Sequence, residues 1–232
     1  MKKRRIVCLT LALVCALAAL TSCADKTDWE NVPKTTVIAK VGETEVEMDV
    51  VKYYYAELSA ANKIGAALVG ESFSELYKQK GKDIDTSVIY SECVDQVIAY
   101  TALYELAKGQ NLQESYEDAR ERAYDELILA SKDTTYEYYA QYLNAIMDKY
   151  TATESALCDI AAQMYVLRDS ARAYLDKLYE EGGYEKGADA ASEIKKTINE
   201  QLKSVEVVKT YPEEKKVSAN INAIVEDYCS LK

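Results

Sequence analysis

The chain has 232 residues, a formal charge of −11 and no histidine. Its length allows one or two domains with a hydrophobic core. The acidic balance argues against a nucleic-acid-binding protein, which needs a basic surface to neutralise phosphates. The absence of histidine excludes Ser-His-Asp and Cys-His catalytic groups, histidine proton shuttles and most zinc sites. No spacing singles out a pair of carboxylates, so we assign no catalytic residue, metal or cofactor.

The first 22 residues have the form of a lipoprotein signal peptide. A basic segment at 2–5 precedes an apolar run at 6–20, which is too short to cross a membrane. Leu20-Thr-Ser-Cys23 then has the form of a bacterial lipoprotein cleavage box. We expect residues 1–22 to be removed, which lowers the formal charge from −11 to −15, and Cys23 to carry the lipid anchor. An ordinary secretory signal followed by an incidental cysteine is the alternative.

Residues 23–34 are mostly polar and predict a tether to a single folded domain at 35–232. Residues 36–41 predict a strand and residues 44–47 a short return strand, and Gly42 precedes Glu43 in the order that favours a type II′ turn.

Helical patterns occupy most of the rest of the chain. Helices are predicted at 49–69, 73–79, 85–108, 116–130, 134–149, 151–181, 188–203 and 217–228. The β-branched run at 205–211 predicts a third strand, which we expect to pair with the first hairpin because an isolated hairpin is marginally stable. The expected fold is therefore mostly α, in the α+β class, with a long helical arm and a small antiparallel sheet of two or three strands.

The helix predicted at 151–181 is the longest. Thr151-Ala-Thr-Glu154 spells a capping box at its start, and Gly182-Gly183 follows its end. Apolar residues recur along it at spacings of three and four, namely Leu157, Ile160, Met164, Leu167, Ala171, Tyr174 and Leu178. At roughly 40 Å it must pack along a partner helix or project as an arm. A plain core helix fits the pattern equally well.

Three cysteines remain beyond Cys23 in the expected mature chain. They are Cys93, Cys158 and Cys229, and no two have the spacing of a C-x-x-C site. Cys93 and Cys158 fall on apolar helical faces, which predicts that they are buried as small hydrophobic residues. One disulfide, or a free thiol at Cys229, stays open.

Two blocks of sequence carry a resemblance to a known family. Ile38-Ala-Lys-Val-Gly-Glu-Thr-Glu-Val46 is followed by a helix. Leu106-Ala-Lys108 ends the apolar helix, Asn111-Leu112 follow, and Ser115-x-x-Asp118 starts the next. The blocks resemble the V-A-K-V-N-G-E-x-I opening and the A-K-x-x-G-I-x-x-S-x-x-E junction of the SurA/PrsA group of exported foldases. With the long helix in the place of that family's last N-domain helix, the resemblance covers roughly residues 36 to 181.

The resemblance implies a SurA N-terminal-like, chaperone-like domain. Active members of the family carry a parvulin prolyl-isomerase domain after the long helix, and its site uses histidines. This chain has no histidine, and the corresponding place holds only a loop at 182–187 and a helix. We therefore expect no prolyl-isomerase activity and no enzyme.

The chain has 20 tyrosines against one phenylalanine and one tryptophan. Two clusters stand out, made of Tyr53, Tyr54, Tyr55, Tyr136, Tyr138, Tyr139 and Tyr142. Consecutive helical residues point about 100° apart, so these rings cannot all face one core, and we expect some to be exposed. Exposed tyrosines would form an adaptable surface for peptide binding. The alternative is that the rings pack between helices with their hydroxyls in water.

Together these features predict a chaperone-like protein of the bacterial cell envelope. It is expected to be lipid-anchored on the extracytoplasmic side of the membrane and to bind unfolded or exported polypeptides between the helical arm and the N-terminal helices. Its acidic surface would favour cationic clients. A non-catalytic envelope scaffold or ligand-binding lipoprotein on the same fold is the alternative.

Overall fold

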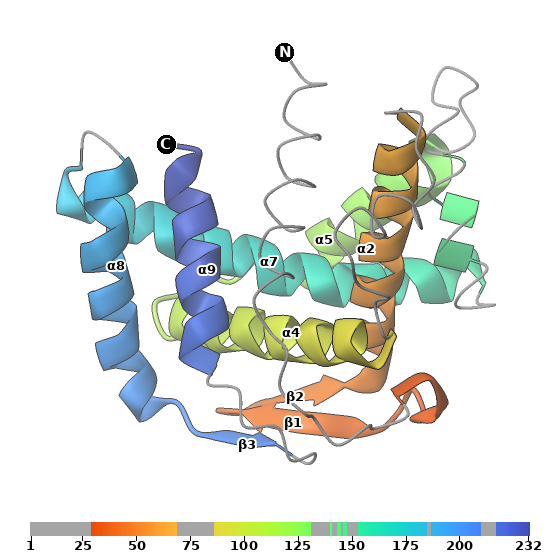
Figure 1. The fold of residues 1–232 in the computed structure, drawn as a ribbon, viewed down its shortest axis with the longest axis horizontal. Helices are drawn as coiled ribbons and strands as arrows, with labels where there is room; N and C mark the ends of the chain where they lie inside the picture. Colours follow the sequence, from red (N-terminus) through yellow and green to blue (C-terminus); the bar gives the residue numbers. More distant parts are fainter. Residues whose placement is uncertain are drawn as a thin grey trace, which may run out of the picture.

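The computed structural model is mostly helical with one small sheet, as the sequence predicts (Figure 1). The structure describes residues 29–68, 86–130, 140, 143, 144, 146, 147, 153–184, 187–209 and 217–232. The expected signal peptide, Cys23 and the first half of the tether lie outside these residues, as does the helix predicted at 73–79. The second half of the predicted tether, 29–34, is part of the fold, because Trp29 and Val32 are buried in the core. The described residues of the helix predicted at 134–149 are helical.

The elements follow the predicted order closely. They are η2 (Trp29–Asn31), β1 (Val37–Val41), β2 (Thr44–Glu47), α2 (Met48–Leu68), α4 (Thr86–Lys108), α5 (Tyr116–Tyr124), η3 (Asp125–Leu129, a π-helical turn), α7 (Glu154–Gly182), α8 (Gly187–Gln201), η6 (Leu202–Ser204), β3 (Val207–Lys209) and α9 (Val217–Ser230). Within the described ranges, no helix combines the length and the apolar character needed to cross a membrane.

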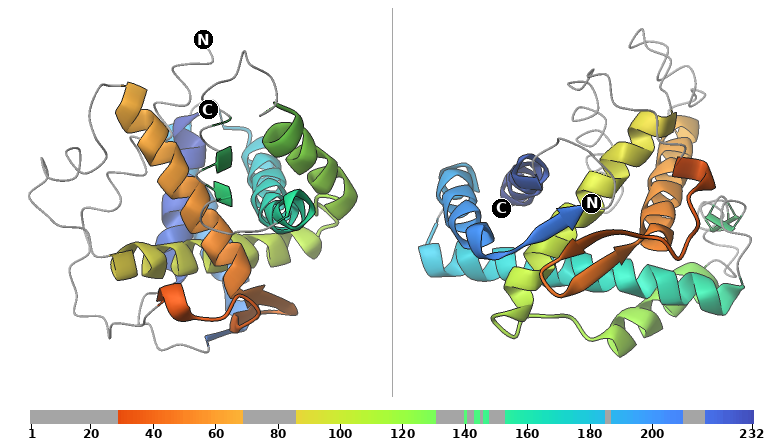
Figure 2. Two further views of the ribbon diagram at one scale, coloured as in Figure 1. Left: turned by 90° about the vertical axis from the view of Figure 1, so that its right-hand side faces the viewer. Right: turned by 90° about the horizontal axis from the view of Figure 1, so that it is seen from below.

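The three strands form an antiparallel sheet with β1 in the middle. The strand order is β2-β1-β3, which confirms that the late strand pairs with the first hairpin. Among the described residues, positive φ angles occur at Gly42, Gly183 and Asn111, so within the β1–β2 turn the left-handed conformation is confined to Gly42. A type II′ turn needs this at its first central residue alone. Figure 2, right, shows the sheet lying beneath α4, with β3 running from α8 toward β1.

Helix α7 forms the centre of the fold. Its apolar seam is buried from Leu157 to Tyr174, and it packs along α4, α5 and α2, with α8 and α9 near its C-terminal half (Figure 1). The long helix therefore packs along helices of its own chain and does not project as an arm. Its start corrects the prediction that Thr151 is the cap. Thr153 is the N-cap and accepts the Ala156 N–H at 3.3 Å, because it directly precedes the first helical residue.

Several other local predictions hold. Ser115 is the N-cap of α5 and accepts the N–H of Asp118, as the block at 115–118 predicts. Cys93, Cys158 and Cys229 are buried free thiols, so the first two behave as the predicted small hydrophobic residues.

The C-terminal helix α9 packs against α8 and α4 and is tied to α7 by polar contacts at its end. Asp176 accepts hydrogen bonds from the Tyr228 hydroxyl at 2.5 Å and from Lys232 Nζ at 2.7 Å. Burial alone would raise the pKa of Asp176, but these two hydrogen bonds and the positive charges of Lys232 and Arg172 together outweigh it and leave the pKa below its ordinary value. The ionised carboxylate is therefore the form that stabilises the fold.

We predict that Asp176→Asn lowers the free energy of unfolding near neutral pH by about 0.5 kcal/mol, a small value because the pair is partly exposed. Because the pKa of Asp176 is lower in the folded state than in the unfolded state, its ionised carboxylate stabilises the fold at any pH above the unfolded pKa of about 4. This stabilisation is lost as the pH falls below that value. Urea denaturation of both proteins from pH 7 to pH 3 should show the difference shrinking below about pH 4. A difference that grows on acidification would contradict this linkage.

Helices α8 and α9 lie side by side, and they approach closely at Gly187 (Figure 1). A Cβ atom at this position would overlap the backbone carbonyl of Cys229 in α9. Backbone atoms cannot rotate away as a flexible side chain can, so any larger residue must push the two helices apart.

We predict that Gly187→Ala lowers the free energy of unfolding by about 2 kcal/mol, the usual cost of overpacking a tight contact. Gly109→Ala is the matched control, because a Cβ there has its nearest neighbours at an ordinary 3.6 Å. The control should stay within about 0.5 kcal/mol of the parent in urea denaturation. Equal stabilities of the two variants would show that the α8–α9 contact is not tight.

Candidate binding cleft

The first tyrosine cluster is buried, which corrects the expectation that part of it is exposed. Tyr53, Tyr54 and Tyr55 are 0%, 8% and 6% exposed. The prediction assumed that α2 has one buried side, whereas α2 is packed against both α4 and α7. Tyr55 stacks on Tyr90 with ring centroids 3.9 Å apart, and Tyr54 meets Tyr100 edge-on at 6.5 Å. These rings hold helices together and offer no surface to a client.

The other predicted site residues lie outside the described part of the chain. They are the lipid-bearing Cys23 and the second tyrosine cluster, Tyr136, Tyr138, Tyr139 and Tyr142.

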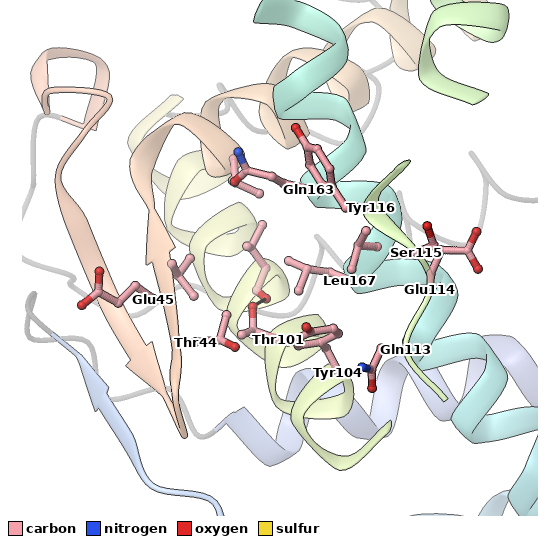
Figure 3. Close-up of a pocket in the computed structure, with 14 residues that line it drawn as sticks. Thr44, Glu45, Thr101, Tyr104, Gln113, Glu114, Ser115, Tyr116, Gln163 and Leu167 are labelled. Carbon is pink, nitrogen blue, oxygen red and sulfur yellow. Dashed lines mark hydrogen bonds between the residues drawn. The ribbon is translucent and has the colours of Figure 1, made fainter. Parts of the chain in front are cut away.

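A cleft of about 620 Å³ lies between β2, α4 and α7, and we refer to it as the β2–α4–α7 cleft (Figure 3). Its lining residues are Thr44, Glu45, Val46, Val50, Val97, Thr101, Tyr104, Gln113, Glu114, Ser115, Tyr116, Gln163, Val166 and Leu167. In Figure 3, β2 lies on one side and α7 with the segment at 113–116 on the other, while Thr101 and Tyr104 of α4 lie between them. Its volume falls in the range of ordinary ligand sites.

The lining combines an apolar base with a polar margin. Val46, Val50 and Leu167 are buried at the base, where the Thr101 hydroxyl donates to the Val97 carbonyl at 2.8 Å. The margin carries exposed amides and hydroxyls, and the charged lining residues are both glutamates, Glu45 and Glu114. A ligand would therefore meet aliphatic contacts below, hydrogen-bonding groups at the sides and negative charge at the rim.

The β2 wall is positioned by Glu105 of α4. Its carboxylate accepts the Thr44 hydroxyl at 2.5 Å and the Glu43 N–H at 3.4 Å. Lys108 contacts the same group at 3.6 Å and also reaches Glu43 at 3.1 Å. A Cβ at Gly42 would lie 2.6 Å from this carboxylate, so the glycine allows both the turn and the approach of α4. The hairpin is thereby pinned to the helix that forms the base of the cleft.

The opposite wall is held by two contacts to α7. The N–H of Glu114 donates to the Ser170 hydroxyl at 2.8 Å, and Ser170 is fully buried. The Tyr116 hydroxyl donates to Asp159 at 3.4 Å, and Asp159 is also paired with Arg120 at 2.6 Å. Burial, with the Asp159 charge beside it, raises the pKa of Tyr116 and keeps its hydroxyl protonated.

An ion pair fixes α2 against α7 beyond the cleft. Arg168 binds both oxygens of Glu57, each at 3.0 Å, in the bidentate arrangement that gives arginine pairs their directionality. The Tyr165 ring lies 5.0 Å from the Arg122 guanidinium and 5.2 Å from that of Arg168, within cation–π range. The Glu57–Arg168 pair joins α7 to α2, the helix that also supplies Val50 to the lining of the cleft.

No known protein guides the interpretation of this cleft. The described residues contain no group of three or more Cys, Asp or Glu side chains placed to hold a metal ion. No protein-family model, curated protein or solved structure matches the chain. The cleft was not predicted from the sequence because its lining residues come from four separate segments. Within its own segment, each lining residue resembles any other residue of a strand, helix or loop.

We predict that Ser170→Ala lowers the free energy of unfolding by about 1–2 kcal/mol, because it leaves the Glu114 N–H without its buried acceptor. The Glu114 amide should also exchange with deuterium faster than in the parent. Ser230→Ala is the control, since the exposed Ser230 hydroxyl only donates to the Asp227 carbonyl of its own helix. Unchanged stability and exchange in Ser170→Ala would show that this wall is held by other contacts.

Proposed function

We propose that the protein is a lipid-anchored, extracytoplasmic, chaperone-like protein of the bacterial envelope. It binds unfolded or exported polypeptides in the β2–α4–α7 cleft and has no prolyl-isomerase activity. The observation that carries the proposal is the lining of the cleft, with an aliphatic base, a margin of neutral polar groups and two glutamates as its charged residues. Such a lining suits segments that combine apolar and basic side chains.

The composition of the chain supports the same class of ligand. The formal charge of −11 attracts cationic polypeptides over a distance, and the glutamates of the cleft continue that field to the site. Neutral amides and hydroxyls can pair with either donors or acceptors of a backbone. Such groups can bind peptides of many different sequences, as a chaperone with many clients requires.

The sequence resemblance supports the same role. Ile38–Val46 and the junction at 106–118, which resemble the SurA/PrsA foldases, place residues on two walls of the cleft, including Val46 and Ser115. The first tyrosine cluster is buried and offers no surface to a client, and the second cluster lies outside the described residues.

The test measures whether the purified protein suppresses light scattering by an enzyme that aggregates on thermal unfolding. Gln163 is an exposed residue of α7 that lines the cleft, so Gln163→Trp places a large ring there. The variant should need a roughly tenfold higher protein concentration to suppress the light scattering, which corresponds to a loss of about 1.4 kcal/mol in binding. The effect should also fall with added salt, because exposed charges contribute to it.

Thr197→Trp is the matched control, an exposed neutral residue of α8 outside the cleft lining. It should act like the parent. Absence of any suppression by the parent, or equal suppression by the two tryptophan variants, would overturn the proposal of a client-binding cleft.

A ligand-binding lipoprotein is the second candidate, and the volume of about 620 Å³ favours it, since it matches a site for a small molecule. Native mass spectrometry of the protein isolated from its source distinguishes the two. A bound small molecule that Gln163→Trp displaces, together with no affinity for unfolded chains, would favour this candidate over the first.

A further inference from the structure

The edge of β2 faces the β2–α4–α7 cleft with its main chain. Thr44, Glu45 and Val46 all line the cleft, yet successive side chains of a strand point to opposite faces of a sheet. A space that touches all three must therefore run along the edge of the strand. Figure 3 supports this arrangement, because the Glu45 carboxylate points away from the cleft and from its α4 residues Thr101 and Tyr104.

Among the residues that the structure describes, no further strand pairs with this edge. In the order β2-β1-β3, β2 is the terminal strand on the side of the cleft. Such an edge presents backbone N–H and C=O groups that can pair with another chain. In this fold those groups face a cleft that α7 and the segment at 113–116 limit on the other side, so the space beside β2 is bounded.

The hairpin register identifies which residue offers its backbone. Val41 pairs with Thr44 across the two-residue turn, Lys40 with Glu45, and Ala39 with Val46. The pair that closes such a turn is hydrogen-bonded, and hydrogen-bonded and non-hydrogen-bonded pairs alternate along the ladder. Glu45 is thus in a non-hydrogen-bonded pair, and its N–H and C=O point outward to the cleft.

We propose that the cleft takes up an extended polypeptide segment as an added strand on β2, paired with the backbone of Glu45. This inference rests on the proposed function and specifies its binding mode. Every second side chain of the segment packs on the aliphatic base at Val97 and Leu167. A cationic segment is favoured by the negative charge around the cleft, where Glu45 and Glu114 are the charged lining residues of an acidic chain. Backbone pairing gives affinity with little demand on sequence.

The experiment uses a fluorescently labelled peptide that alternates valine with lysine, and fluorescence anisotropy with the full protein. Glu45→Pro removes the outward N–H and leaves the ladder to β1 intact, because that N–H does not pair with β1. Glu45→Ala is the matched control, since it lacks the carboxylate but keeps the N–H. We expect Glu45→Pro to bind about fivefold more weakly than Glu45→Ala, the loss of one backbone hydrogen bond. Equal affinities of the two variants would overturn the pairing.

A second measurement leaves the protein unchanged and applies whether or not Glu45→Pro folds. The same peptide with every backbone nitrogen methylated keeps its side chains and loses its N–H donors. The wild-type protein should bind it at least about tenfold more weakly than the unmodified peptide. Equal binding of both peptides would refute strand addition but leave client binding in place. No binding of the unmodified peptide would refute the proposed function as well.

Discussion

The burial of α7 between α4, α5 and α2 determines where the other elements lie. Leu157 and Met164 are fully buried in its seam, and burying a side chain of this size stabilises by about 1.5–3 kcal/mol. The exposed ion pairs around the helix, such as Arg120 with Asp159, contribute about 0–1 kcal/mol each. Each buried seam residue therefore contributes more stability than an exposed ion pair beside it, and the polar contacts help to select one arrangement of the helices.

The sequence predicted the parts of the fold that depend on local or periodic signals. The sequence signals of three features each lie within a single element or turn, namely the turn at Gly42, the cap at Ser115 and the seam of α7. The third strand was predictable because a hairpin needs another strand to be stable. The cap of α7 was placed two residues early, since Thr151 and Thr153 carry the same hydroxyl and only the geometry decides which one precedes the first turn.

The first tyrosine cluster is buried for a reason that concerns packing. Three consecutive helical residues point in different directions, so a helix that packs on one side only must leave at least one of them exposed. Tyr53, Tyr54 and Tyr55 would include an exposed ring if α2 lay at the surface in this way. Helix α2 has α4 and α7 on different sides, so rings that point in different directions still find partners. Tyrosine suits such a position because its ring is apolar and its hydroxyl can reach a polar group. The combination of an apolar ring and a polar hydroxyl, which suits tyrosine to a binding surface, thus also suits it to packing between helices.

The cleft exists because the hairpin is anchored at one end. Glu105 fixes the turn end of β2 to α4 through the Thr44 hydroxyl, and Ser170 fixes the facing segment to α7 through the Glu114 N–H, so neither wall is held by the backbone of Glu45. A protein that bound its ligand with the same groups that hold its walls would have to break one set of contacts to make the other. Here the outward backbone of Glu45 takes no part in the β1 ladder, and a bound strand would extend the sheet at no cost to the pairing already present. Neither the register nor the anchors are visible in the composition of the chain, which is why this surface could be found only from the structure.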